Sequence, residues 1–516
     1  MGTALEAAHG LLDRVEQRRQ AVSARLDNKA RAQMGQFFTP APTAAFIADQ
    51  LDLSRRRVLR VLDPGAGVGS LTCALVSRVL REQPDVEVQV TACEADPLLC
   101  APLRETLEEC ATSAGAVGGR VDYELREGDF IAWAAEAAAF GGADLFDVVI
   151  MNPPYRKLGR ATAERSLVAA AATDVSNLYA AFLALAVQLL ADDGQLVAIT
   201  PRSFTNGPYF KNFRRFFLDR MELERLHVYH SRTSVFADTD VLQENVIFTA
   251  RRTDAPRRPP VMISVSNGHG DEPASRLVPF EQVVHPRDAE RFWHIDLDDD
   301  ADALAELSTE LPASLADLGL SVSTGRVVDF RAAEHLHPEP CPGDVPLIYP
   351  LHMRDGRISW PVPGARKCNA IALNPDTSKL TFPTGYYPVV KRLSSKEERR
   401  RVVAALFDPE DTACEAIGFE NHVNVVHADG CGLNPELARG MTLWLNSTVL
   451  DLLVRRFSGH TQVNATDLRN LRYPAVSELT ALGSDWTQGP LPSQDKIDAL
   501  ITTHVSACSN TLGGRD

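Results

Sequence analysis

Between Val58 and Ile199 the chain alternates short apolar runs with longer stretches of helical periodicity. The apolar runs have the length of strands, and in the stretches between them apolar residues recur every three to four positions. Strands that alternate with helices predict a doubly wound, mostly parallel α/β sheet, in which ligands bind beyond the carboxyl ends of the strands. The predicted strands lie in RVLRVLDPG, VQVTACEAD, FDVVIMNPP and GQLVAITP.

The pattern weakens after RRTDAPRRPP, residues 251–260, where prolines and arginines interrupt it. The region beyond is rich in Pro and Gly and has only short apolar runs, which indicates an irregular, mixed α/β second domain. A chain of 516 residues also exceeds one ordinary core. We therefore expect an N-terminal helical segment (1–30), an α/β domain (31–252), a connecting region (253–310), a mixed second domain (311–475) and a C-terminal tail (476–516).

The composition is that of a globular protein, with 45% hydrophobic and 23% charged residues. The N-terminus lacks the pattern of a secretory signal, and the chain has no apolar run of about 18 residues. These features predict a cytoplasmic protein that does not enter a membrane. The nine cysteines include no CxxC pair, so neither a disulfide framework nor a bound metal is expected.

The net charge of −15 argues against a strongly basic nucleic-acid binder, because phosphate contacts need Lys and Arg. The charge is unevenly distributed, however. Residues 320–516 contribute only −2 of it. A local basic face in the second half of the chain is therefore compatible with the composition.

A glycine-rich turn follows the first predicted strand. VLDPGAGVGSLT places Asp63, Gly65 and Gly67 after the strand and before a helix. Glycines at such a position let the backbone turn tightly and approach a ligand. A purely structural strand-to-helix turn is the alternative.

Two further carboxylates follow in the sequence: Glu94 ends the second predicted strand, and Asp129 follows the next apolar segment. Glu94 in ACEAD is placed to accept hydrogen bonds from the ribose hydroxyls of a nucleoside. Asp129 in REGDF is placed to accept from an adenine amino group, with Phe130 against the ring. Each carboxylate alone is more often a helix cap, but their placement at successive strand ends predicts a nucleoside cofactor.

The glycine-rich turn alone would also fit a nicotinamide dinucleotide. The tetrapeptide NPPY, residues 152–155, distinguishes between that interpretation and a cofactor for methyl transfer. Asn152 offers an amide oxygen, and Pro153 offers a carbonyl without an adjacent N–H donor. When an amino group donates both its hydrogens to two acceptors, its nitrogen becomes more tetrahedral and its lone pair becomes available. Tyr155 is expected to stack on the ring that carries this amino group. The pattern indicates attack by an amine on an electrophilic methyl group.

These residues resemble the gamma-class adenine-N6 DNA methyltransferases of type II restriction–modification systems, with a TaqI-like catalytic domain. The order of GQFFTPAPTAAFIADQL, LDPGAGVGS and NPPY is that of the family. The resemblance implies S-adenosylmethionine as cofactor. It assigns the methionine end to Phe37, Thr39 and Pro40, the amino-acid portion to Asp63, Gly65 and Gly67, the ribose to Glu94, the adenine to Asp129 and Phe130, and the target base to Asn152, Pro153, Pro154 and Tyr155, with Phe236 of SVFADTDVLQENVIF on its other face.

A second resemblance lies in the C-terminal half. VVKRLSSKEERRRVVAAL and SGHTQVNATDLRNLRYP resemble the recognition half of the PstI and BsuBI modification methylases. These segments offer Lys391, Arg392, Lys396 and Arg399–Arg401 for phosphates, with a solvated helix face as the alternative for KEERRR. They offer His460, Thr461, Gln462 and Asn464 for base edges or backbone.

The resemblance implies methylation of a flipped adenine in double-stranded DNA, which protects the site from a separate cognate restriction endonuclease. Three alternatives stay open: a methyltransferase that acts on RNA, one that acts on a protein glutamine, and a catalytically silent DNA-specificity subunit. Cytosine-C5 chemistry needs a nucleophilic cysteine after a proline. The chain has one Pro-Cys pair, at Cys341 in EPCPGD, far from the predicted strand ends.

Overall fold

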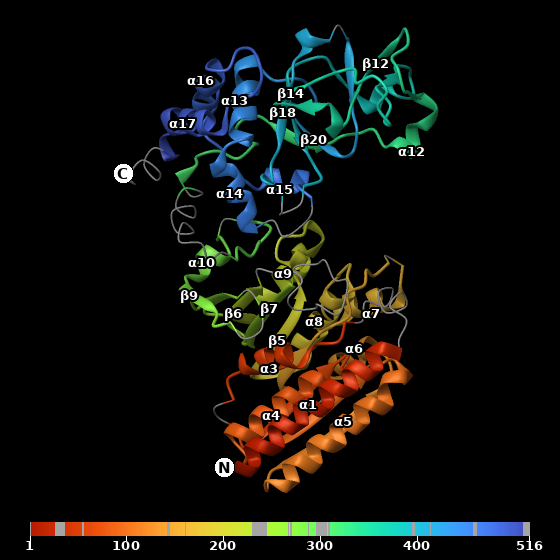
Figure 1. The fold of residues 1–516 in the computed structure, drawn as a ribbon, viewed down its shortest axis with the longest axis vertical. Coiled ribbons are helices and arrows are strands. Elements are labelled where there is room, and N and C mark those ends of the chain that lie inside the picture. Colours follow the sequence, from red (N-terminus) through yellow and green to blue (C-terminus); the bar gives the residue numbers. More distant parts are fainter. Residues whose placement is uncertain are drawn as a thin grey trace. The chain divides into compact units, whose positions relative to one another are not determined.

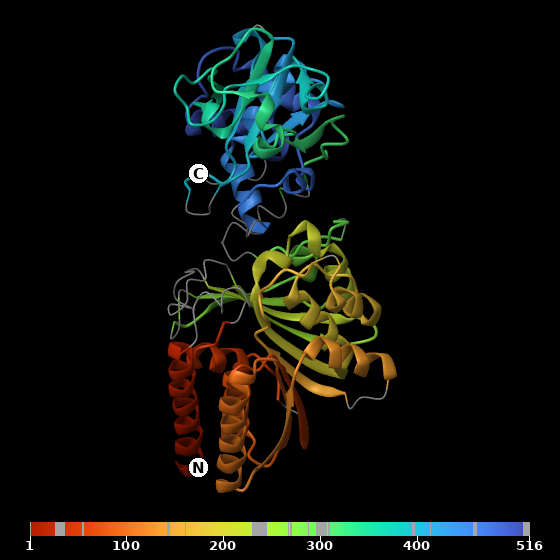
Figure 2. The same ribbon diagram turned by 90° about the vertical axis from the view of Figure 1, so that its right-hand side faces the viewer.

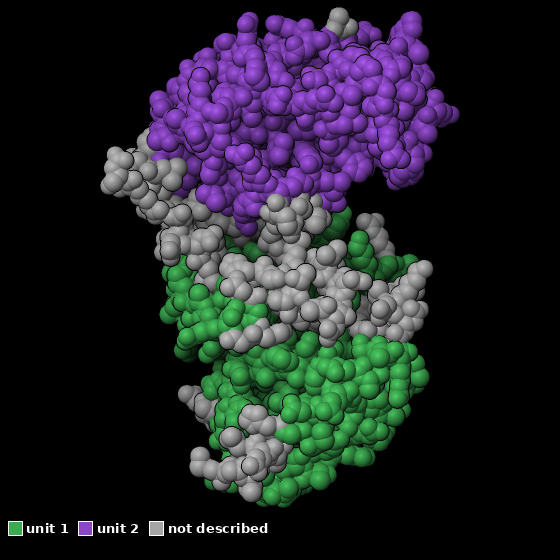
Figure 3. Space-filling view, in the orientation of Figure 1, with its two compact units in different colours: residues 1–297 green, residues 298–516 purple. Residues whose placement is uncertain are grey.

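The computed structural model describes residues 2–25, 37–53, 56–141, 145–159, 161–229, 245–266, 268, 271–286, 288–295, 307, 310–394, 398–412, 414–457 and 462–508. The chain forms two compact units, residues 1–297 and 298–516 (Figure 3). Among the described residues, no helix has the length and apolar character that crossing a membrane requires.

Unit 1 is built on one large sheet, which confirms the predicted α/β fold (Figure 1). Nine strands of its described part lie in the order β3-β2-β1-β4-β5-β7-β6-β8-β9. Neighbours are parallel except at the β5–β7, β6–β7 and β8–β9 pairs. The strand order reverses between β1 and β4, and such a reversal creates the crevice where ligands bind in open α/β sheets. The strands are β1 (Val58–Pro64), β2 (Glu87–Glu94), β3 (Arg120–Glu127), β4 (Phe146–Met151), β5 (Leu190–Pro201), β6 (Met221–Tyr229), β7 (Asn245–Arg252), β8 (Val261–Ser266) and β9 (Ala274–Val278).

Helices cover both faces of this sheet (Figure 2). One face packs against α1 (Gly2–Arg25), α3 (Ala41–Asp49), α4 (Ser70–Glu82) and α5 (Pro97–Ala116). The other packs against α6 (Phe130–Phe140), α7 (Ala163–Ala171), α8 (Leu178–Leu189), α9 (Lys211–Leu218) and the short α10 (Phe280–Val283). Every residue of α8 except Gln188 is buried, which explains its uniformly apolar sequence.

The N-terminal helix α1 is tied to two other helices. The Arg18 guanidinium donates to the Thr106 hydroxyl of α5 at 2.9 Å and also pairs with Glu109. At the opposite side of α1, Glu16 accepts a 3.0 Å hydrogen bond from the backbone N–H of Ala41, the first residue of α3. The start of α3 is therefore held by a helix that is itself anchored to α5.

Unit 2 contains two smaller sheets and a group of helices. One sheet has the strand order β10-β20-β17-β18-β14-β13 and the other β11-β15-β12-β19-β16. The strands are β10 (Ser321–Thr324), β11 (Leu336–His337), β12 (Asp344–Ile348), β13 (Met353–Arg354), β14 (Arg357–Ile358), β15 (Ala370–Ala372), β16 (Thr381–Pro383), β17 (Tyr387–Lys391), β18 (Ala404–Phe407), β19 (Ala416–Phe419) and β20 (Val423–His427). The helices are α12 (Asp329–Ala332), α13 (Pro435–Leu445), α14 (Thr448–Phe457), α15 (Ala465–Arg469), α16 (Val476–Ser484) and α17 (Gln494–His504).

Two segments differ from their expected roles. Residues 261–278, expected in a connecting region, supply β8 and β9 of the first sheet, where Val261 and Ile263 are buried. Residues 476–504, expected in a tail, form α16 and α17. Both helices bury apolar residues in the core of unit 2, among them Leu479 and Ile501.

Helices α13 and α16 pack at backbone contact. A Cβ atom at Gly440 would lie 1.7 Å from the carbonyl oxygen of Leu479, and one at Gly483 would lie 1.8 Å from that of Glu436. Only glycine permits so close an approach at both positions. The pair joins the C-terminal helices to the rest of unit 2.

Candidate active site

The carboxyl ends of β1, β2 and β4 surround a cavity of about 450 Å³. Pockets for small molecules and cofactors are typically ~300–1,000 Å³. The segment before α3 closes one side of the cavity, and the start of α8 contributes to another. Nine of the predicted site residues line it: Phe37, Thr39, Gly65, Gly67, Glu94, Asp129, Phe130, Asn152 and Pro154.

The glycine-rich turn holds its shape through left-handed backbone conformations. Gly67 has a φ of +61° and Gly69, which caps the N-terminus of α4, a φ of +84°. A Cβ atom at Gly69 would lie 2.9 Å from Thr106 Cγ2 of α5. The turn therefore requires glycine for both backbone conformation and space.

Asp63 lies behind this turn and is not among the lining residues. Its side chain is fully buried, and Oδ2 accepts a 2.7 Å hydrogen bond from the Thr72 hydroxyl. Oδ1 has no hydrogen-bond partner within the described structure. Burial raises the pKa of the Asp63 carboxyl to about 7, against the opposing effect of the Thr72 bonds. Asp63 supports the turn rather than facing the cavity.

Glu94 ends β2 and connects the two strand-end turns. Its Oε2 accepts from the Gly67 N–H and its Oε1 from the Asp96 N–H, both at 2.8 Å. The side chain lines the cavity although the residue is only 6% exposed. Burial raises the pKa of Glu94, and these two N–H donors oppose the rise. Each carboxylate oxygen keeps further acceptor capacity for a hydroxyl group.

Asp129 caps a helix and also lines the cavity. Its Oδ1 accepts a 2.9 Å hydrogen bond from the Ile131 N–H, so it caps the N-terminus of α6. Asp129 is also exposed and lines the cavity. The adjacent Phe130 is buried, with its ring centroid 4.7 Å from that of Phe182. The cap thus fixes a carboxylate beside an aromatic wall.

The Asn152 amide is oriented by the segment before α3. Its Nδ2 donates to the backbone carbonyl of Phe37 at 2.8 Å and to the Thr39 hydroxyl at 3.0 Å. Its Oδ1 accepts a 2.8 Å hydrogen bond from the Tyr155 hydroxyl. Both amide hydrogens are therefore engaged, and the amide oxygen is the atom left with spare acceptor capacity.

Tyr155 and Pro153 lie against this amide, outside the set of lining residues. The Tyr155 ring centroid is 5.3 Å from that of Phe37 and 6.2 Å from that of Tyr179, with the second pair edge to face. Burial raises the pKa of the Tyr155 phenol, so the group keeps its proton and can donate it to Asn152. Pro40 also lies outside the lining, and Phe236 lies outside the described residues.

Several lining residues were not identified from the sequence. Leu178 and Phe182 come from the buried helix α8, where spacing alone does not distinguish cavity residues from core. Arg156 directly follows NPPY, and this proximity was an available signal. The other lining residues that the sequence reading missed include Phe38, Val68, Ser70, Leu99 and Glu164.

In unit 2 the structure joins the two segments predicted to contact DNA. Leu393 and Gln462 form an antiparallel bridge, and the Val463 N–H donates to the Arg392 carbonyl at 2.7 Å. The Arg392 side chain donates to the Asn421 carbonyl at 3.0 Å, and Lys391 Nζ lies 3.2 Å from Glu398 Oε2. Asn464 precedes α15, and its backbone N–H donates to Asp467 at 2.7 Å. His460, Thr461 and Lys396 lie outside the described residues.

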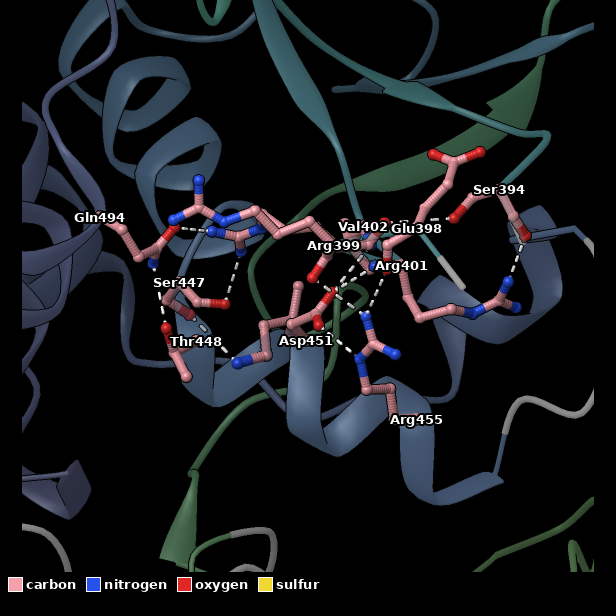
Figure 4. A network of polar contacts seen from close by, with 12 residues as sticks. Ser394, Glu398, Arg399, Arg401, Val402, Ser447, Thr448, Asp451, Arg455 and Gln494 are labelled. Atoms are coloured by element: carbon pink, nitrogen blue, oxygen red, sulfur yellow. Dashed lines mark hydrogen bonds and ion pairs between the residues drawn. The ribbon is translucent and has the colours of Figure 1, made fainter. Parts of the chain in front are cut away.

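Part of the basic run at 399–401 has a structural role (Figure 4). Arg401 is fully buried, and its backbone N–H donates to Asp451 Oδ1 at 2.6 Å. Arg400 donates to the Ser447 carbonyl at 2.8 Å, and Arg455 donates to Asp451 Oδ2 at 2.7 Å. Arg400 and Arg401 thus connect the chain before β18 to the start of α14. This structural role replaces the phosphate contacts that the sequence predicted for them. The neighbouring Arg399 is exposed.

Comparison with known proteins agrees with this geometry. The Eco57I restriction-modification methylase family matches residues 105–236. The type II methyltransferase M.PstI of Providencia stuartii is 38% identical over 94% of this chain and 96% of its own length. M.BsuBI of Bacillus subtilis is 39% identical over 92% of this chain and 93% of its own. The fold resembles that of the type IIL restriction-modification enzyme MmeI in complex with DNA, with a TM-score of 0.54 at 10% identity over 99% of this chain and 74% of that one.

Fold and site together define a methyltransferase of the restriction–modification class. The chain belongs to the type II methyltransferase family that includes M.PstI and M.BsuBI, which confirms the resemblance seen in its motifs.

Proposed function

We propose that this methyltransferase transfers a methyl group from S-adenosylmethionine to the exocyclic N6 amino group of a flipped adenine in double-stranded DNA. One observation carries the proposal: Asn152 has both amide hydrogens engaged by Phe37 and Thr39, which leaves its oxygen as the atom with spare acceptor capacity. A group that presents only an acceptor selects a substrate that donates, and an amino group is such a donor. Methylation of this kind would protect the site from a cognate restriction endonuclease, a separate protein.

The cavity fits the proposed cofactor. Glu94 presents a buried carboxylate with spare acceptor capacity, as two ribose hydroxyls require. Asp129 and Phe130 offer an acceptor and an aromatic wall to an adenine ring. Phe37 and Thr39 line the same cavity beside Asn152, so the cofactor and the target amine would meet at one place. S-adenosylmethionine, when bound there, supplies an electrophilic methyl group on a sulfonium sulfur.

Asn152 and Pro153 would act on the target nitrogen by accepting its two hydrogens. Hydrogen bonds from both N–H groups would favour a tetrahedral nitrogen, which presents its lone pair to the electrophilic methyl group that the cofactor supplies. The surplus proton on nitrogen passes to solvent, because neither an amide nor a peptide carbonyl is a base of sufficient strength. Tyr155 would hold the Asn152 oxygen from one side and the target base by its ring.

Unit 2 would choose the DNA sequence. The bridge between Leu393 and Gln462 brings Arg392 and Gln462 together from segments about seventy residues apart in the chain. Contacts from Arg and Lys to phosphates position a protein on DNA, whereas amide side chains can read base edges. Extraction of the adenine costs a few kcal/mol, which contacts in the base pocket would offset.

The alternative functions differ in the molecule that receives the methyl group. RNA bases and protein glutamine also carry amino groups, so the Asn152 geometry is compatible with both. The likeness to M.PstI and M.BsuBI along more than 90% of the chain, unit 2 included, favours DNA. A silent specificity subunit would have no use for the complete set of Glu94, Asp129 and Asn152 at one cavity.

The test is transfer of a labelled methyl group by the purified chain to duplex DNA, RNA or a protein acceptor, followed by mass spectrometry of the digested products. We expect N6-methyladenine from duplex DNA. Label in RNA or in glutamine with unlabelled DNA, or methylcytosine in place of methyladenine, would contradict the proposal. Methylation-sensitive long-read sequencing of the modified DNA then gives the recognition site.

A substitution at Asn152 tests whether methyl transfer takes place at this cavity. Asn152→Ala should abolish transfer while largely preserving S-adenosylmethionine affinity, because the amide addresses the amine and not the cofactor. Asn421→Ala is the control, since only the backbone carbonyl of Asn421 is used in the contact with Arg392. Equal activity of Asn152→Ala and the unmodified protein would remove the catalytic assignment.

A further inference from the structure

Three side chains that commonly bind metal ions meet in the connection between β11 and β12 of unit 2. His337 ends β11, Asp344 begins β12, and Cys341 lies between them in HPEPCPGD. Their ligand atoms, one from each residue, all lie within 4.8 Å of one another. Across the described residues, no other group of three His, Cys, Asp or Glu side chains comes together in this way.

Hydrogen bonds explain the positions of two of these side chains. Asp344 Oδ2 lies 2.7 Å from His337 Nδ1 and accepts from the Cys341 N–H at 2.8 Å. The Asp344 side chain is only 4% exposed, so the loop is folded around its carboxylate. The Cys341 thiol is different. It is exposed, and its sulfur has one weak contact, 3.8 Å from the Glu339 carbonyl oxygen.

The loop that carries the three side chains is stiff. Pro338, Pro340 and Pro342 fix three backbone φ angles and remove three N–H donors from this short segment. Gly343 then reverses the chain toward Asp344 with a φ of +91°. A loop already restricted in this way loses little conformational entropy when it binds a ligand.

We propose that His337, Cys341 and Asp344 bind one divalent transition-metal ion of the zinc type, with water as the fourth ligand. Imidazole, thiolate and carboxylate are all zinc ligands, whereas Mg²⁺ and Ca²⁺ prefer oxygen alone. A thiolate and a carboxylate together balance the charge of the ion. This site lies outside the methyl-transfer cavity, and the inference is independent of the proposed function.

The geometry needs only a small adjustment. From zinc bond lengths of about 2.0–2.3 Å, tetrahedral ligand atoms lie about 3.3–3.8 Å apart. The longest present separations, up to 4.8 Å, therefore close by about 1 Å. The hydrogen-bonded pair of His337 Nδ1 and Asp344 Oδ2, now 2.7 Å apart, opens by a similar amount as the metal ion replaces the proton between them. The exposed Cys341 side chain and the His337 side chain, which is 37% exposed, have room to make this movement. The bound ion would join the end of β11 to the start of β12, both neighbours of β15 in one sheet.

The sequence gives no recognisable sign of this site. Zinc sites are usually marked by paired cysteines at CxxC spacing, whereas these ligands follow the spacing HxxxCxxD in a proline-rich segment. Only the turn of the chain at Gly343 brings Asp344 back beside His337.

Cobalt is the probe for the first experiment, because Co²⁺ occupies zinc sites and absorbs strongly when a thiolate is bound to it. Full-length protein is dialysed against a chelator and titrated with Co²⁺. We expect a thiolate-to-cobalt charge-transfer band that saturates at one ion per chain and disappears when Zn²⁺ is added. Cys341→Ser should abolish the band, and His337→Ala should weaken Co²⁺ binding at least tenfold.

Cys431→Ser is the matched control, because Cys431 is also an exposed cysteine of unit 2 and should be dispensable. A second measurement follows thermal unfolding. Zn²⁺ should raise the Tm of the unmodified protein and of Cys431→Ser, but not that of Cys341→Ser. The proposal is overturned if the unmodified protein gives no thiolate band, or if the band survives in Cys341→Ser or is lost in Cys431→Ser.

Discussion

Thr39 and Asn152 lie 113 residues apart in the sequence, yet the Thr39 hydroxyl accepts a 3.0 Å hydrogen bond from the Asn152 amide. Together with the Phe37 carbonyl it holds the nitrogen end of the amide and leaves the oxygen as the end with spare acceptor capacity. An asparagine at a strand end can rotate its amide by half a turn with little change in shape. The segment before α3 therefore determines the orientation of the Asn152 amide in NPPY.

Thr39→Val should lower kcat about fivefold while changing the KM for DNA little. The variant leaves one amide hydrogen of Asn152 without a partner, and a hydrogen bond of this kind contributes about 1 kcal/mol. Steady-state methyl transfer measures both constants. Thr39→Ser keeps the hydroxyl and should restore the rate. If serine and valine reduce kcat equally, the hydroxyl does not orient Asn152.

Glu94→Gln should weaken S-adenosylmethionine binding by about 1.5–3 kcal/mol, because a charge-assisted acceptor for the ribose is lost. The amide also places an N–H donor toward one of the two backbone N–H groups of Gly67 and Asp96. Calorimetric titration gives the Kd. Glu108→Gln, on the exposed side of α5, is the control and should bind normally. An unchanged Kd for Glu94→Gln would leave Glu94 with a purely structural role.

Asp63 should make stability depend on pH between its ordinary pKa of 3.8 and its raised value of about 7. Since the folded state binds the proton more tightly than the unfolded state, this contribution to stability is complete below the lower value. It is lost as pH rises through the higher one. Asp63→Asn stays neutral, so its Tm relative to the unmodified protein should increase from pH 5 to pH 8. A constant difference across this range would contradict the shift.

Gly440→Ala should strongly destabilise unit 2, because the new methyl group would lie 1.7 Å from the Leu479 carbonyl oxygen. The helices α13 and α16 would have to separate. Gly115→Ala in α5 is the matched control, with no atom within 4 Å of the added Cβ, and should be neutral or slightly stabilising. Hydrogen exchange followed by mass spectrometry distinguishes loss of protection in unit 2 from a general effect. Equal protection in both variants would show that the helix pair tolerates separation.

The sequence identified the sheet and most of the cavity because the informative residues lie at the ends of strands. Glu94 ends the strand β2, Asn152 follows the buried strand β4, and Asp129 follows the half-exposed edge strand β3. The carboxyl ends of these parallel strands meet at one edge of the sheet. Asp63 shows the limit of this reasoning. It also lies at a strand end, but its side chain turns to Thr72 behind the glycine turn. Spacing gives the end of a strand and does not give the direction of each side chain there.

Unit 2 was harder to predict for a related reason. Its strands are short and its contacts join distant segments, so local periodicity is weak. The run at 399–401 has the composition of a phosphate-binding surface, yet Arg401 is fully buried. Its environment depends on Asp451 in α14, fifty residues further along the chain. The edge strand β9 and the helices α16 and α17 were missed because each has only a few buried residues.

The hydrogen bond from Ala41 to Glu16 has a practical consequence for work with this enzyme. An expression clone that begins at Phe37, where the recognisable motifs start, would discard the helix against which α3 is set. Loss of that support would be transmitted through Pro40 to Thr39, and so to the Asn152 amide that lines the cavity. Truncation at a point that looks harmless in the sequence would then produce a folded protein in which the Asn152 amide is poorly aligned.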